Sequence, residues 1–189
     1  MTRIEKLRTL PEDVKIGSII HSFKTFALGD IEYNITRPIA AFILGSCFID
    51  QMAAYRYNHG TTSNEEHYKK FINEYLKEYN SFDLYNNLRC LIIHNYTLGE
   101  YMSLTSELEA IDQQEDILHV NILTARRFHS ALSRAFSEFS KDILKINSQA
   151  RINAVNRYNE APVLVMNNYE IPVYSEDDAD YLIVFFPKK

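Results

Sequence analysis

Arg89 and His94 are the two residues whose types and spacing most directly suggest chemistry. Histidine is the side chain whose ordinary pKa lies nearest neutral pH, so it can take up or release a proton during a reaction. Arginine stays charged and can stabilise the negative charge that develops on a phosphate. The pair therefore indicates acid–base chemistry at a phosphate, with no need for a metal.

The segment around this pair carries a family resemblance. Residues 83–96 read DLYNNLRCLIIHNY, and the spacing places an Arg, four residues and a His on one helix. This resembles the motif helix of the HEPN superfamily (higher eukaryotes and prokaryotes nucleotide-binding domains). The resemblance implies an all-α bundle, and catalytic members are dimeric, metal-independent endoribonucleases of toxin or defence type. It assigns catalysis to Arg89 and His94, and supporting roles to the neighbouring Asn86, Cys90, Asn95 and Tyr96.

Two readings of the motif stay open. In catalytic HEPN members a polar residue usually follows the Arg, whereas here it is Cys90. That departure favours the alternative function, a non-catalytic HEPN-like dimer that binds a nucleotide, an RNA or a partner protein. In the simplest structural interpretation, Arg89 is a solvated edge residue and His94 a helix C-terminal residue favourable to the helix dipole.

Helix geometry adds an expectation about assembly. Because an α-helix turns about 100° per residue, Arg89 and His94 are expected about 140° apart. On the same helix, Leu84, Leu88, Leu91, Ile92 and Tyr96 form the arc expected to face the bundle. One chain would then not easily bring both site residues to one atom, but two copies packed face to face could. We therefore expect a homodimer, with RNA or a nucleotide as possible ligand.

Composition excludes several other classes of function. The formal charge of −5 over 189 residues argues against sequence-blind binding of nucleic acid, which requires a basic face. The sequence contains no Gly-rich phosphate loop, nucleophile elbow or CxxC pair, and its histidines lack metal-ligand spacing. We therefore expect neither a cofactor nor a metal. Cys47 and Cys90 lie in apolar patterns and are expected to be buried free thiols, as in a cytoplasmic protein.

No membrane segment is expected. The N-terminus lacks the apolar core of a signal peptide. The most apolar run, from Ile39 to Ile49, is closed by Asp50 and Gln51 and is too short to cross a bilayer. It reads instead as part of a buried helix.

The elements that must position the site are mainly helical. Hydrophobic periodicity predicts helices over about 12–27, 36–57, 65–79, 83–96 and 124–158. Alternation predicts a β-hairpin from short strands near 102–106 and 118–122, joined by an acidic connection, and strand-like runs at 163–166, 171–174 and 181–186. The expected fold class is mainly α, a HEPN-like helical bundle with a small β-hairpin insertion and a short β-rich C-terminal tail.

Two regions are expected along the chain. Residues 1–160 form the helical domain, with the hairpin at about 100–122. Residues 161–189 form the tail, which packs on the domain or on a partner protomer. The apolar run at 181–186 is the reason for this expectation, because such a run needs cover.

Overall fold

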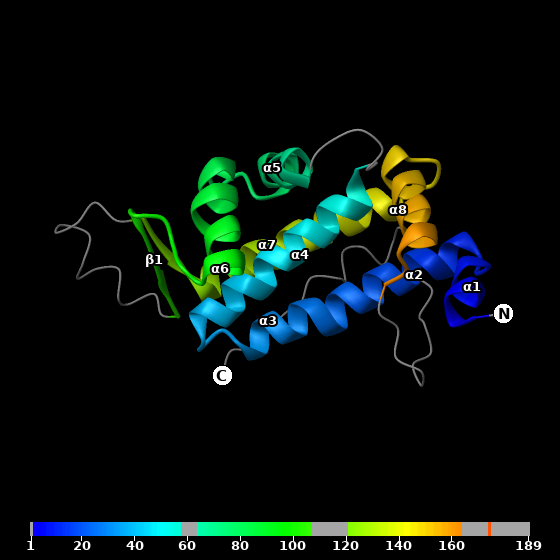
Figure 1. The fold of residues 1–189 in the computed structure, drawn as a ribbon. Helices are drawn as coiled ribbons and strands as arrows, with labels where there is room; N and C mark the ends of the chain where they lie inside the picture. Colours follow the sequence, from blue (N-terminus) through cyan, green and yellow to red (C-terminus); the bar gives the residue numbers. More distant parts are fainter. Residues whose placement is uncertain (1, 58–63, 107–120, 164–173, 175–189) are drawn as a thin grey trace.

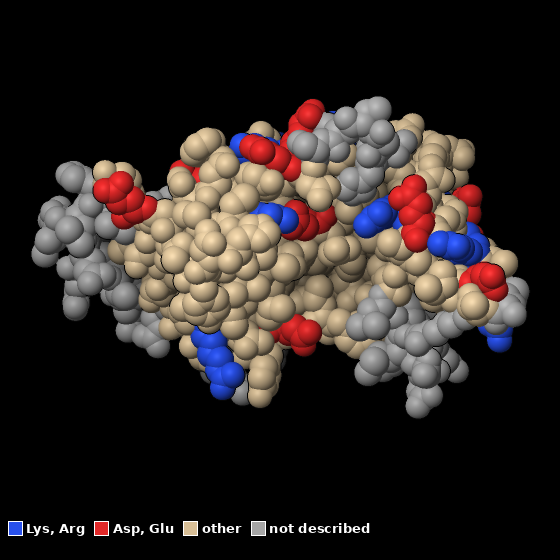
Figure 2. Space-filling model, in the orientation of Figure 1, with Lys and Arg blue, Asp and Glu red and all other residues tan. Residues whose placement is uncertain are grey.

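A computed structural model describes residues 2–57, 64–106, 121–163 and 174, and these residues are mainly helical (Figure 1). Figure 2 shows a broad uncharged area over α6 and the adjoining part of α4. In chain order the elements are α1 Arg3–Arg8, α2 Glu12–Ser22, the π-helical η1 Phe23–Leu28, α3 Gly29–Tyr33, α4 Pro38–Arg56, α5 Asn64–Tyr75, the π-helical η2 Asp83–Arg89, α6 Cys90–Asn95, β1 Met102–Thr105, β2 Asn121–Thr124, α7 Ala125–Leu144 and α8 Gln149–Glu160.

The helix α4 is the centre of the bundle, as its apolar composition predicted. It begins with Pro38 in the first turn, where a missing N–H costs nothing, and packs against α5, α7 and α8. By length and composition α4 is also the one described helix that could cross a membrane, although 56% of its most apolar window is buried in the protein. Core helices share this property, since burial in protein and burial in lipid favour the same residues.

The first long helix continues past the predicted stop at Gly29. The elements α2, η1 and α3 follow one another without a break from Glu12 to Tyr33. Gly29 has φ −62° and ψ −43°, which is ordinary helical backbone. Glycine ends a helix mainly by adopting positive φ, and here it does not do so. The predicted end near residue 27 was therefore too early, because the helical run continues to Tyr33.

The predicted helix over 124–158 is two helices, α7 and α8. Asn147 between them has φ 61°, and the Ser148 hydroxyl caps α8 by accepting from the Arg151 N–H. The Arg151 side chain donates to the carbonyls of Ile143 and Leu144, which end α7 without intrahelical partners. The apolar stripe continued through Ile146 in the sequence, but that side chain is 70% exposed.

The two short strands pair in parallel, so the predicted hairpin was wrong. Met102 pairs with Asn121 and Thr105 with Thr124. Alternation of side chains identifies a strand but carries no information on its direction. The connection at 107–120 lies outside the described residues. β2 leads directly into α7, so this ladder links the segment after α6 to the start of α7.

Most of the predicted C-terminal tail also lies outside the described residues. Within the described part, Val163 is buried and Tyr174 packs against the core. The strand-like runs and the place where the tail packs remain predictions. The last described helix, α8, ends at Glu160.

Candidate functional site

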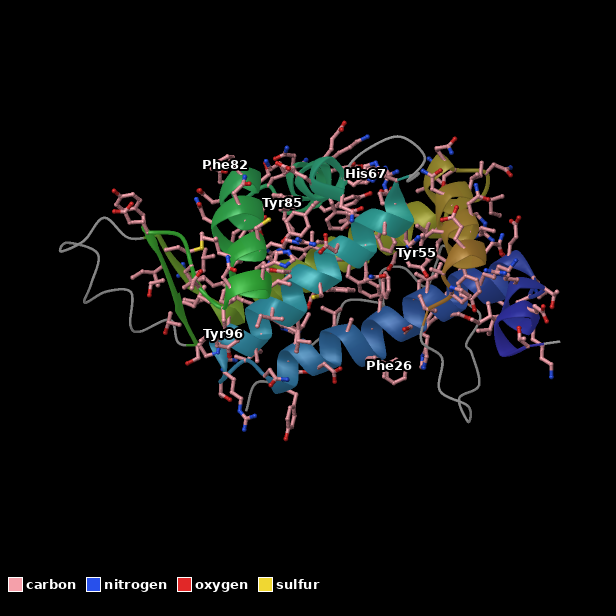
Figure 3. All side chains as sticks on the ribbon, viewed as in Figure 1. Phe26, Tyr55, His67, Phe82, Tyr85 and Tyr96 are labelled. Carbon is pink, nitrogen blue, oxygen red and sulfur yellow. The ribbon has the colours of Figure 1, made fainter. Side chains whose placement is uncertain are left out.

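The motif segment is a helix whose first half is wider than an α-helix. η2 has π-helical hydrogen bonding, and the Cys90 N–H donates to the Tyr85 carbonyl, five residues earlier. Leu84, Leu88 and Ile92 are buried and fasten the segment to the bundle. Figure 3 shows Phe82 and Tyr96 at opposite ends of this helix. π-helical turns occur often at functional sites.

Arg89 is held in place by a carboxylate from α4. Its Nε and Nη2 donate to Oδ2 of Asp50 at 3.1 and 3.0 Å. Both side chains are mostly buried, at 18% and 23% exposure. Burial raises the pKa of Asp50 despite the opposing effect of Arg89. For Arg89, burial alone would lower the pKa, but Asp50 outweighs burial and raises it. Arg89 is therefore charged and oriented.

His94 lies beside the part of Arg89 that Asp50 leaves open. Arg89 Nη1 is 3.4 Å from His94 Nε2, and the His94 side chain is exposed. The expectation that helix geometry keeps the two residues apart within one chain was wrong. An arginine side chain is long enough to reach along the helix, so an angle of about 140° between Cα positions does not fix the distance between side-chain ends.

Tyr85 supports Arg89 from the preceding turn. The Arg89 guanidinium lies 5.6 Å from the centre of the Tyr85 ring, and Lys69 lies 5.3 Å from the same ring. Tyr85 also packs edge-on against the buried Tyr68. Partial burial raises the pKa of Tyr85, with Cys90 as the next cause. The aromatic face thus favours cations on this side of the site.

A small pocket adjoins Arg89, where α4, α5, η2 and α8 meet. Its volume is about 200 Å³. Small-molecule sites usually measure about 300–1,000 Å³, so this pocket has room for a phosphate rather than for a nucleotide. Its lining is polar and includes two arginines and a histidine. The lining residues are Asp50, Gln51, Ala53, Ala54, Asn64, His67, Arg89 and Arg157.

The four supporting candidates are spread unevenly around the pair. Asn86 donates to the Phe82 carbonyl of its own helix, and Asn95 is exposed at the end of α6. The Cys90 thiol interacts with both Tyr85 and Arg89. Tyr96 was expected on the buried arc, but it is 70% exposed because it leaves the helix with φ 57°. Only Cys90 is therefore in contact with the Arg89 side chain.

The two cysteines are free but not fully buried, contrary to the sequence expectation. Cys47 is exposed on α4, and Cys90 is intermediate. Partial burial, with Asp50 as the second cause, raises the pKa of the Cys47 thiol. Because the thiolate is the reactive form, Cys47 is a poor nucleophile at neutral pH.

Sequence reasoning missed Asp50, Arg157 and His67. Asp50 and Arg89 are 39 positions apart on different helices, so no local motif joins them. The one available signal was that Asp50 interrupts an otherwise apolar helix. A charged residue in such a place usually has a partner. No cluster of three or more potential metal ligands occurs among the described residues.

The left-handed backbone at Tyr96 yields a prediction about stability. A side chain other than glycine at positive φ costs about 1–2 kcal/mol. Tyr96→Gly removes this cost, and the exposed ring loses little burial. We expect the variant to gain up to about 1 kcal/mol after the extra chain entropy of glycine is deducted. Urea denaturation measures the change, and Asn95→Gly, inside the helix, should instead lose stability.

Comparison of the chain with protein-family models, with curated proteins and with solved structures found no match.

Proposed function

We propose that the protein is a metal-independent endoribonuclease with a HEPN-like fold, in which Arg89 and His94 act on one RNA phosphate. The proposal is carried by the 3.4 Å approach of Arg89 Nη1 to His94 Nε2, with the rest of the guanidinium held by Asp50. A proton-transfer group and a fixed positive charge thus stand side by side at a solvent-accessible position.

The proposed reaction needs only these two side chains and the substrate. His94 removes the proton from the RNA 2′-hydroxyl, whose oxygen attacks the adjacent phosphorus. Arg89 stabilises the added negative charge of the phosphorane. His94 then returns the proton to the 5′-oxygen as the bond from phosphorus to that oxygen breaks, which leaves a 2′,3′-cyclic phosphate and a free 5′-hydroxyl. The observed contact places Arg89 Nη1 3.4 Å from Nε2 of His94, so the positive charge and the ring that would exchange the proton can act on the same phosphate.

The same region supports a homodimer. On α4, Ile39 and Cys47 are exposed and Ile43 is partly exposed, on one stripe of spacing four. Ile93 of α6 adds to this area, which we call the α4–α6 face, and Figure 2 shows how few charges it carries. A second copy would cover these side chains and enclose the small pocket at Arg89. We propose that copies pair through the α4–α6 face.

The dimer is testable by size. We expect light scattering to give twice the 22.1 kDa monomer mass at micromolar concentration. Cys47→Glu places a charge in the centre of the α4–α6 face and should shift the protein to monomer. Ile146→Glu makes a similar apolar-to-acid change at a site that is 70% exposed near the α7–α8 turn, and should leave the dimer intact. A wild-type protein that stays monomeric contradicts the proposal.

One observation favours a second candidate function, a non-catalytic HEPN-like dimer that binds a nucleotide, an RNA or a partner protein. Asp50 already neutralises much of the Arg89 charge, and Cys90 occupies the place of a polar residue. Both features weaken the attraction of the Arg89 guanidinium for a doubly charged transition state more than its attraction for a singly charged ligand.

Cleavage assays separate the two functions. Purified protein is incubated with end-labelled single-stranded and hairpin RNAs in EDTA, and products are tested for a 2′,3′-cyclic phosphate. The endoribonuclease produces discrete fragments with that end. RNA that is bound but stays intact, with protein shown to be folded and dimeric, selects the non-catalytic function.

A further inference from the structure

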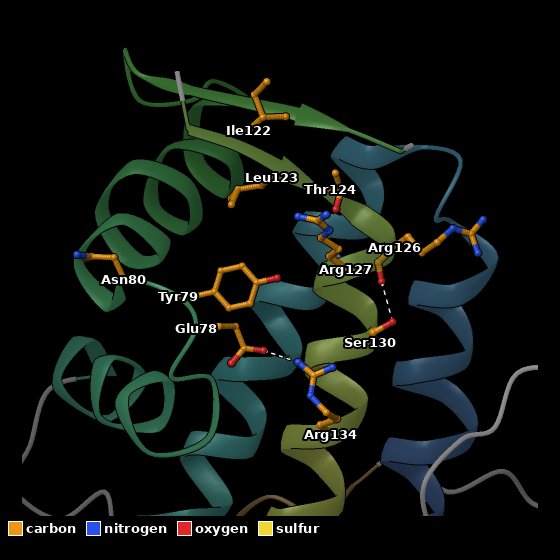
Figure 4. Close-up of a pocket in the computed structure, with 10 residues that line it drawn as sticks. All are labelled: Glu78, Tyr79, Asn80, Ile122, Leu123, Thr124, Arg126, Arg127, Ser130 and Arg134. Carbon is orange, nitrogen blue, oxygen red and sulfur yellow. Dashed lines mark hydrogen bonds and ion pairs between the residues drawn. The ribbon is translucent and has the colours of Figure 1, made fainter. Parts of the chain in front are cut away.

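A second and larger pocket lies between the start of α7 and the segment that joins α5 to η2. Its volume is about 630 Å³. Figure 4 shows Tyr79 pointing from that segment toward α7, with β2 above it. The pocket is lined by Glu78, Tyr79, Asn80, Ile122, Leu123, Thr124, Arg126, Arg127, Ser130 and Arg134.

The lining is basic although the chain as a whole is acidic. Arg127 and Arg134 share the pocket with one carboxylate, Glu78, which pairs with Arg134, whereas the Arg126 guanidinium points away from it (Figure 4). Arg126 and Arg127 are exposed, and neither forms an ion pair with any described residue. Arg127, Ser130 and Arg134 follow at spacings of three and four, so they share one face of α7. Two guanidinium groups against one carboxylate favour an anion.

Thr124 adds an observation that is independent of charge. It is 3% exposed and occupies the N-cap position of α7, yet its hydroxyl makes no capping bond and has no hydrogen-bond partner among the described residues. Thr124 and Arg127 both line the pocket (Figure 4). A buried hydroxyl without a partner is costly. At a helix start, where backbone N–H groups are also free, its natural partner is an anion.

The remaining lining residues suit a ligand larger than a bare ion. The phenol of Tyr79 is a further donor, and Ile122 and Leu123 form an apolar wall. The Ser130 hydroxyl donates to the Arg126 carbonyl and can only accept from a ligand. Burial raises the pKa of Tyr79 to about 12, and Glu78 adds to this shift. The phenol therefore keeps its proton and can donate to an anion at any physiological pH.

We propose that this pocket binds the phosphate groups of a phosphorylated ligand, through Arg127, Arg134 and Thr124. The charge favours a multiply charged group, and the volume lies in the range of about 300–1,000 Å³ that is typical of small-molecule sites. Arginine suits phosphate because its planar donors bind two oxygens at once. The site is separate from Arg89 and His94 and does not depend on the proposed nuclease activity.

Calorimetric titration with pyrophosphate at constant ionic strength tests the proposal. Wild-type protein should bind, and Arg127→Gln should weaken binding by about 10–100-fold, as expected for loss of a charged donor. Arg37→Gln, the same change at an exposed residue outside both pockets, should bind as wild type. Arg89→Ala should also bind normally. Loss of binding in Arg89→Ala but not in Arg127→Gln would assign the phosphate to the other pocket and overturn the proposal.

Two further variants exclude a merely structural effect. Thr124→Val keeps the side-chain shape and removes the unpartnered hydroxyl, so the protein should melt no lower than wild type while binding pyrophosphate about 2–10-fold more weakly. Glu78→Gln releases Arg134 from its ion pair and should tighten binding. Unchanged affinity in both variants would contradict the proposed contacts.

Two more probes show which class of ligand carries the bound phosphate. ATP represents a small phosphorylated molecule, and a short RNA without terminal phosphates represents a nucleic-acid backbone. If ATP binds more tightly than the RNA, and Arg127→Gln abolishes the binding of ATP, the pocket is a small-molecule site. Displacement of pyrophosphate by the RNA identifies a backbone contact. Failure of pyrophosphate, ATP and RNA alike to bind overturns the proposal.

Discussion

His94→Ala is expected to abolish RNA cleavage in EDTA. His94 is the histidine whose ring nitrogen lies 3.4 Å from Arg89, and general acid–base catalysis contributes about 10²–10⁴-fold to rate. Arg89→Ala should be about as severe, since loss of a charge-stabilising donor costs about 10²–10³-fold. His94 is exposed, so its removal should leave the melting temperature unchanged. Rates on end-labelled RNA and thermal melts of the same preparations measure both effects.

The matched control is His21→Ala, a histidine of α2 outside both pockets, which should cleave as wild type. His129 is unsuitable as a control, because its side chain is only 2% exposed and its loss would disturb the core. Full activity in a carefully purified His94→Ala protein would show that His94 takes no part in the reaction.

Mixed dimers show whether one site draws both residues from one chain. Because Arg89 and His94 approach within 3.4 Å in a single chain, a dimer of one Arg89→Ala and one His94→Ala protomer has no intact pair. We expect it to be inactive. A dimer of wild type with the double variant keeps one pair and should retain about half of the activity. Recovery of activity in the first mixture would mean that each site takes Arg from one protomer and His from the other.

Gly45→Val is expected to have the largest effect on stability. A Cβ atom at Gly45 would lie 2.4 Å from Cε1 of Phe128, on the facing helix α7. Phe128 is fully buried and stacks on Phe42 with ring centres 4.7 Å apart, so it has little room to move. Overpacking of this kind costs about 3 kcal/mol, the upper end of the usual range. The melting temperature should fall by roughly 6–12 °C for a chain of this size.

Gly29→Ala serves as the opposite case. No atom lies within 4 Å of a Cβ placed at Gly29, and its backbone is helical. Alanine should therefore raise stability by about 1 kcal/mol through helix propensity alone. If Gly45→Val melts like wild type, the close approach of α4 and α7 at Gly45 is not a constraint on the fold.

The sequence predicted the helices well where neighbouring residues mark the start or the apolar face of a helix. Pro38 and the apolar run after it placed α4 within two residues of its observed bounds. The stripe from Ala125 to Ile143 predicted α7 for the same reason. The break after Leu144 was missed because the spacing of three and four continues across it, while the Asn147–Ser148 turn depends on backbone angles.

Contacts between segments far apart in the sequence could not be predicted from such local patterns. The direction of β2 relative to β1 depends on the path of the chain between them, which no alternation pattern records. The pairing of Arg89 with Asp50 depends on how α4 and η2 pack. The sequence thus singled out Arg89 and His94 as candidates, but it indicated neither their contact within one chain, nor the carboxylate that orients Arg89, nor the basic pocket on α7.

The π-helical turns of η2 bear on how this site tolerates insertions and deletions. A turn closed by a bond from residue i+5 to residue i holds one residue more than an α-helical turn. Deleting one residue between Asp83 and Leu88 would allow a regular α-helix, so the bundle could survive the loss. Because the wide turn absorbs that one residue, the helix after the deletion could keep its place, with Leu88 and Ile92 still buried. Arg89 would then stay beside Asp50, and its spacing to His94 would be unchanged. Related chains that are one residue shorter just before the motif could therefore share the site as well as the motif.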